Sequence, residues 1–66
     1  MKQILLNGQP YQTQANFIGE LIDELELNGK RIAIELNQQL IPKSRHLSTS
    51  IDEQSKIEVV HAVGGG

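Results

Sequence analysis

The sequence predicts a two-layer α+β domain, in which one helix packs on one face of a small β-sheet. Apolar side chains alternate with polar ones in several short segments, and one further segment shows helical spacing. The length of 66 residues fits a single small domain with a thin core. With one Tyr, one Phe and no Trp, that core must be built from aliphatic side chains.

The first expected element is a β-hairpin. The apolar run QILL over 3–6 is followed at once by Asn7-Gly8, and both central positions of a type I′ turn favour residues that accept positive φ. The return segment 9–14 contains Pro10, which cannot donate a ladder hydrogen bond and therefore suits an edge strand. The first strand is thus expected to be central and the second to lie at the edge.

The segment NFIGELIDELEL predicts an amphipathic helix of about three turns. Its apolar side chains recur with helical spacing and form one stripe: Ile18, Leu21, Ile22 and Leu25. Asn16 is the expected N-cap, and Asn28-Gly29 is the expected C-terminal stop. Gly19 falls in the first turn, which predicts a frayed helix start.

Three strands are expected after the helix. Residues 31–36 alternate with period two, and Asn37-Gln38-Gln39 predicts a turn into a short strand over 40–41 that Pro42 ends. The polar stretch 43–55 is expected to be irregular. Its expected buried anchors are Leu47 and Ile51.

The last strand is expected over 56–63. Its alternation places Ile57 and Val59 on the face toward the helix. The opposite face receives Glu58, Val60 and Ala62. The full order is β-β-α-β-β-β.

Composition narrows the function classes. The net charge of −2 and the scattered basic residues disfavour nucleic-acid binding. The apolar runs are far shorter than the roughly 20 residues that span a bilayer, and the start does not resemble a signal peptide, so no membrane role and a cytoplasmic location are expected. The chain has no Cys, which leaves no thiol nucleophile.

Other polar residues do not suggest catalysis or a metal site. His61 and His46 have no recognised ligand spacing with the carboxylates, and a solvated or half-buried strand histidine is the better interpretation of His61. The helix carboxylates are expected to be solvated: Glu20, Asp23, Glu24 and Glu26. The sequence GGG is not a phosphate-binding loop, because no helix follows it.

The whole layout resembles the ubiquitin-like β-grasp fold, and the chain is similar to the ThiS family of thiamine-biosynthesis sulfur carriers. The resemblance covers nearly the whole chain and rests on the Asn7-Gly8 turn, the ELIDEL helix centre, IAIELNQQLIP and the ending IEVVHAVGGG. It implies a β-grasp domain over 1–63, with a mixed sheet of about four to five strands. A flexible glycine tail follows over 64–66.

The resemblance also implies a mechanism. The carboxylate of Gly66 would be adenylated and then converted to a thiocarboxylate. Val63, Gly64 and Gly65 would thread the active sites of partner enzymes, because glycine has no Cβ to obstruct a narrow channel. The chain would therefore be a carrier and co-substrate with no catalytic residues, not an enzyme.

The implied partners are a ThiF-like adenylyltransferase that uses ATP and Mg²⁺, a ThiG-like thiazole synthase, and a sulfur donor such as a persulfide-bearing enzyme. No cofactor is expected on this chain itself. Strand alternation suggests a partner docking patch on the sheet face away from the helix, formed by Leu5, Ala33, Val60 and Ala62.

Alternatives remain at this level. A small subunit of a molybdopterin synthase shares the fold and tail, although that family tends to be longer. A ubiquitin-like interaction module that is never activated would use only the sheet patch. The three glycines could also be an ordinary frayed end.

Overall fold

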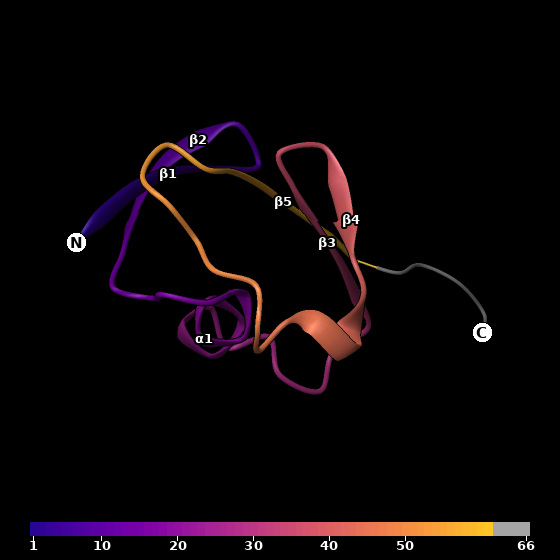
Figure 1. Ribbon diagram of the computed structural model, residues 1–66. Helices are drawn as coiled ribbons and strands as arrows, with labels where there is room; N and C mark the ends of the chain where they lie inside the picture. The colour runs from indigo at the N-terminus through magenta and orange to yellow at the C-terminus, as the bar shows by residue number, and fades with distance from the viewer. Residues whose placement is uncertain (62–66) are drawn as a thin grey trace.

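The computed structural model describes residues 1–61, which form a five-stranded mixed sheet with one α-helix on one face (Figure 1). The elements are β1 (Lys2–Leu6), β2 (Gln9–Thr13), α1 (Ile18–Glu24), β3 (Ile32–Leu36), β4 (Gln39–Ile41), the 3₁₀ turn η1 (Lys43–Arg45) and β5 (Lys56–His61). The spatial order is β2-β1-β5-β3-β4. β5 pairs parallel with β1, and the other neighbours pair antiparallel. The predicted two-layer α+β arrangement is confirmed.

The core lies between α1 and the inner face of the sheet. Its buried apolar residues are Ile4, Ala15, Ile18, Leu21, Ile22, Ile34, Ile51 and Ile57. The helix residues Ile18, Leu21 and Ile22 belong to the predicted apolar stripe, and Ile57 was predicted to face the helix. The edge position of β2 is also confirmed, whereas β1 is an interior strand and the middle of the sheet is β5.

Both antiparallel hairpins turn through two residues with positive φ. Asn7 and Gly8 have φ of 51° and 81°, and Asn37 and Gln38 have φ of 51° and 73°. Positive φ at both central positions is the type I′ geometry, which matches the right-handed twist of the flanking strands. The second turn thus needs only two residues, so Gln39 belongs to β4 and not to the turn.

The helix begins differently from the prediction. Its N-cap is Phe17, not Asn16, and no side chain caps it. Instead the Ile18 N–H donates to the Thr49 carbonyl at 2.9 Å and the Gly19 N–H donates to the His46 carbonyl at 2.8 Å. A distant loop therefore satisfies the first helical donors in place of a side-chain cap. Fraying of the helix start stays a prediction.

The helix also ends earlier than Asn28-Gly29. It has seven residues, short of three turns, and Glu26 just beyond it adopts a φ of 60°. The Glu26 N–H donates to the Asp23 carbonyl and the Leu27 N–H donates to the Ile22 carbonyl, at 3.0 and 2.9 Å. These two bonds form a Schellman motif. Sequence reasoning missed it because Glu26 occupies the left-handed position that glycine usually fills.

The segment between η1 and β5 runs beside α1 before it returns to the sheet (Figure 1). Ile51 is 1% exposed, as predicted, but Leu47 is 78% exposed and is not a buried anchor. Leu47 lies instead over Gly19, where an added Cβ would collide with the Leu47 side chain. Among the described residues, no helix is long and apolar enough to cross a membrane.

Candidate functional site

The candidate site is centred on β5, because the sequence AVGGG follows this strand directly. β5 lies between β1 and β3. Ile57 has no exposed surface, and Val59 packs against the core on the same inner face. The strand that leads into the glycines is therefore anchored to the rest of the domain along its length.

Asparagines from the two hairpin turns hold both sides of β5. The Asn7 N–H donates to the Ile57 carbonyl at 2.9 Å, and the Asn7 Oδ1 accepts from the Val59 N–H at 2.8 Å. On the other side, the Asn37 N–H donates to the Lys56 carbonyl at 2.7 Å and its Oδ1 accepts from the Lys56 N–H at 2.9 Å. Each turn thus extends the sheet hydrogen bonding of β5 by one side chain.

The predicted docking patch is only partly brought together. Ala33 and Val60 are direct cross-strand partners on the sheet face away from α1, where Val60 is 50% exposed. Leu5 faces the same side but pairs with Lys56, four positions before Val60, or about 13 Å along a strand. The strand register therefore separates Leu5 from the other two residues. Ala62 lies outside the described residues.

Sequence reasoning missed Leu40 on this face. Leu40 is 65% exposed and is the cross-strand partner of Glu35. Its neighbour Ile41 pairs with the fully buried Ile34, so alternation sends Leu40 to the outer side. Extending the period-two analysis to the three-residue strand β4 would have found it. We call Ala33, Leu40 and Val60 the outer patch.

The predicted tail positions lie beyond the described part of the chain. They are Val63, Gly64, Gly65 and Gly66. The predicted domain boundary at 63 falls there as well, so the division into a β-grasp domain and a glycine tail stays a prediction.

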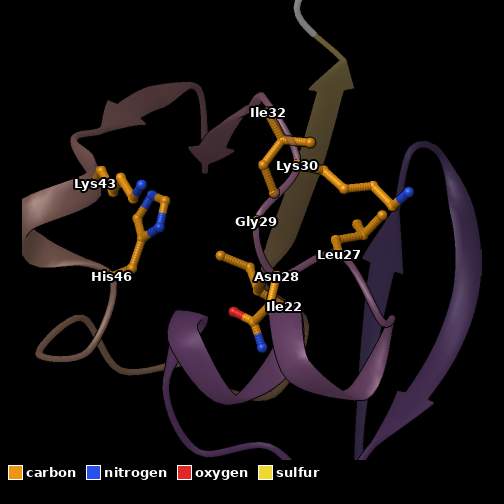
Figure 2. A pocket seen from close by; sticks show the side chains of 8 residues that line it. All are labelled: Ile22, Leu27, Asn28, Gly29, Lys30, Ile32, Lys43 and His46. Carbon is orange, nitrogen blue, oxygen red and sulfur yellow. The ribbon is translucent and has the colours of Figure 1, made fainter.

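A small pocket on the helix side of the sheet, open to solvent, has a volume of about 70 Å³. Figure 2 shows its lining from the exit of α1 and from the segment after β4: Ile22, Leu27, Asn28, Gly29, Lys30, Ile32, Lys43 and His46. The Lys30 side chain projects to the side opposite His46 in this view (Figure 2). The buried His46 ring places Nε2 3.1 Å from the Ile41 carbonyl oxygen.

The helix carboxylates are exposed, as predicted, and two of them make structural hydrogen bonds. Glu24 accepts from the Tyr11 hydroxyl at 2.7 Å and from Thr13 Oγ1 at 2.9 Å. The hydrogen bond to the negatively charged Glu24 raises the pKa of Tyr11. Glu20 accepts from the Asn16 N–H at 2.7 Å. These contacts join the hairpin and its connection to α1.

Histidine and carboxylate side chains do not gather into a metal site in the described part of the chain. No group of three or more residues of the His, Cys, Asp and Glu types within 1–61 could hold a metal ion. His61 is exposed and lies opposite Ile32 at the end of β5.

Several known proteins are similar to this chain in sequence. The sequence model of the ThiS family matches residues 4–66. The sulfur carrier protein ThiS of Bacillus subtilis is 32% identical over 63 residues, which cover 92% of this chain and 96% of that protein. The protein ycf40 of Porphyra purpurea is 39% identical over 64 residues, which cover 96% of this chain and 90% of that protein.

A longer relative and a solved structure add to this. A thiazole synthase of Paramagnetospirillum magneticum is 29% identical over 65 residues, which cover 97% of this chain but only 20% of that protein. The crystal structure of the thiamine biosynthesis protein ThiS from Geobacter metallireducens has a TM-score of 0.84 at 20% identity, with 97% of this chain and 99% of that chain covered. The latter likeness supports the β-grasp fold.

Proposed function

Because the chain belongs to the ThiS family, we propose that it is a sulfur carrier of thiamine biosynthesis, activated at the Gly66 carboxylate. The observation that carries the proposal is the position of β5. The middle strand of the sheet is held by backbone ladders on both sides and by Asn7 and Asn37, and it leads directly into AVGGG.

The chemistry follows from the weakness of a carboxylate as an electrophile. A carboxylate oxygen of Gly66 attacks the α-phosphorus of ATP, and pyrophosphate leaves. The terminal sulfur of the donor's persulfide then attacks the acyl carbon, and AMP leaves. A thiol of the sulfur-transfer system attacks the acyl disulfide that results; the S–S bond breaks, the thiol is oxidised to a disulfide with the donor, and the thiocarboxylate is released. The resulting thiocarboxylate is a soft nucleophile that can deliver its sulfur to an electrophilic intermediate. This chain acts as co-substrate in each step, while the adenylyltransferase binds ATP and Mg²⁺.

The proposed acceptor is a thiazole synthase. The name of the relative that contains a similar region over one fifth of its length supports this assignment. The proposed activating partner is a ThiF-like adenylyltransferase, and a persulfide-bearing enzyme is the proposed class of sulfur donor. Val63, Gly64 and Gly65 would thread the active sites, since residues without large side chains pass through narrow channels.

We also assign partner docking to the outer patch. Ala33 and Val60 lie on the face away from the core, in the row nearest the end of β5. An enzyme that holds the glycine tail must also cover the surface where that strand ends. Exposed apolar side chains there would contribute binding energy that a tail of glycines cannot.

Intact-mass spectrometry tests the carrier function. The protein is incubated with the ThiF-like adenylyltransferase of its own organism, ATP, Mg²⁺ and a sulfur donor. The expected result is exchange of one oxygen for sulfur, located at Gly66 by fragmentation. A semisynthetic chain with a Gly66 carboxamide is the matched control and should not react. An unchanged mass of the free acid under conditions that activate the carrier of Bacillus subtilis would contradict the proposal.

Growth rescue separates the pathways. In a strain that lacks its own thiamine sulfur carrier, the chain should restore growth without added thiazole, and a deletion variant that lacks residues 64–66 should not. Rescue of a molybdopterin-deficient strain instead would favour the molybdopterin synthase alternative. Rescue by the deletion variant would favour an interaction module that is never activated.

A further inference from the structure

Two glutamates oppose each other in the middle of the outer sheet face. Glu35 of β3 and Glu58 of β5 are direct cross-strand partners. Directly opposed residues on one sheet face have Cβ atoms about 4.5–5.5 Å apart. Like charges at this spacing destabilise a sheet, so the pair has an energetic cost in the free protein.

Nothing in the described part of the chain neutralises this pair by direct contact. Neither carboxylate has a hydrogen bond or ion pair within residues 1–61. Lys56 faces the same side, two positions before Glu58 on β5, but it forms no ion pair with either glutamate there. Glu35 is half-buried and Glu58 is exposed.

Apart from Lys56, the surroundings of the pair are apolar or open. Leu40 lies beside Glu35 in the same row of the sheet, and Ala33 and Val60 form the adjacent row toward the end of β5. On the β1 side, Glu58 borders a shallow hollow that is open to solvent. The hollow is lined by Leu5, Gly8, Lys56, Ile57 and Glu58. A long side chain from another protein can reach Glu58 there.

We propose that the ThiF-like adenylyltransferase places a basic side chain, arginine or lysine, against the Glu35–Glu58 pair while its apolar groups cover the outer patch. This inference rests on the proposed carrier function, which requires an enzyme to bind next to the end of β5. A cation between the carboxylates offsets their repulsion. The unfavourable energy of the pair in the free protein is therefore absent from the complex, and this favours binding. A second copy of this chain would instead bring two more carboxylates to the same face.

Binding of purified wild-type carrier and variants to the ThiF-like adenylyltransferase of the same organism tests the proposal. The variants are Glu35→Gln and Glu58→Gln, and Glu26→Gln on the helix layer is the matched control for the same change of charge. Each outer-face variant should weaken binding roughly two- to fivefold at low salt. The difference from wild type should shrink as salt screens the contact. The control should bind like wild type.

The cost of the pair in the free protein is measured separately. Glu35→Gln should raise the melting temperature of the isolated carrier by about 1–6 °C, because it removes one of two opposed charges. A carrier that becomes more stable but binds its enzyme less well would be difficult to explain by a purely structural role. No rise in melting temperature would overturn the premise that the pair is unfavourable.

The result distinguishes this inference from the carrier function. If wild type gains sulfur at Gly66 but both glutamine variants bind like Glu26→Gln, the basic partner contact is wrong and the carrier function stands. If the variants weaken binding in a salt-dependent way but Gly66 gains no sulfur, the docking surface stands and the carrier function fails.

Discussion

The asparagine of the first hairpin turn should stabilise β5, a strand that is distant in the sequence but in direct contact with the turn. Asn7 adopts a φ of 51°, and its Oδ1 accepts the Val59 N–H at 2.8 Å. That N–H lies beyond the last residue pair of the β1–β5 ladder, which is Leu6 with Ile57. The side chain therefore takes the place of the strand that has already turned away.

Two substitutions separate the roles of Asn7. Asn7→Gly keeps the positive φ and removes the acceptor, so it should cost about 0.5–1.5 kcal/mol, the usual net value of one hydrogen bond. Asn7→Ala also removes the short polar side chain that makes asparagine tolerant of positive φ, and this adds up to about 1–2 kcal/mol. In a domain of this size, each kcal/mol lowers the melting temperature by about 4–8 °C.

Urea denaturation and amide hydrogen exchange check the prediction. Stability should fall in the order wild type, Asn7→Gly, Asn7→Ala, and Asn7→Asp should stay close to wild type because Asp keeps both an acceptor and tolerance of positive φ. The Val59 amide should exchange faster in Asn7→Gly by more than the global loss of stability explains. Equal local protection of Val59 in wild type and Asn7→Gly would refute the reasoning.

The remaining predictions concern the helix and its link to the hairpin. Glu26→Gly should stabilise the fold by about 1 kcal/mol in urea denaturation, because glycine adopts the observed φ of 60° without a steric cost; a loss of stability would contradict the Schellman assignment. Thr13→Val should cost about 1–3 kcal/mol, because the buried Thr13 Oγ1 accepts from the Ala15 N–H and donates to Glu24; an unchanged urea midpoint would refute this. The Tyr11 pKa is raised mainly by its hydrogen bond to Glu24, so this contact stabilises the fold below the ordinary tyrosine pKa and is lost as pH rises through the raised value. Ultraviolet titration should therefore show the Tyr11 midpoint shifting down in Glu24→Gln, and an identical midpoint would refute the assigned cause.

Local patterns were sufficient for the strands and the first turn. Asn7-Gly8 predicted a type I′ hairpin because both residues accept positive φ, and the observed angles confirm it. Alternation predicted the inward faces of β3 and β5 because the side-chain period of a strand is two. These features depend on neighbours in the chain, so the chain order alone specifies them.

The ends of α1 could not be predicted in the same way. Its first N–H groups are satisfied by carbonyls of His46 and Thr49, about thirty residues later in the chain. Its last turn is closed by Glu26 in a conformation that its residue type disfavours. Long-range hydrogen bonds replaced the side-chain cap that the local sequence indicated.

In the candidate site, too, some features are specified by the local sequence and others are decided by the fold. The outward direction of Val60 could be inferred from residue order, since it depends on strand alternation, whereas the chemistry of the glycine ending is implied by the family resemblance and stays a prediction. Which outward side chains become neighbours depended on strand order and register, and these separated Leu5 from Val60 and placed Glu35 opposite Glu58. Pairing between strands far apart in the chain is decided by the packing of the whole domain, so only the folded molecule could reveal the acidic pair.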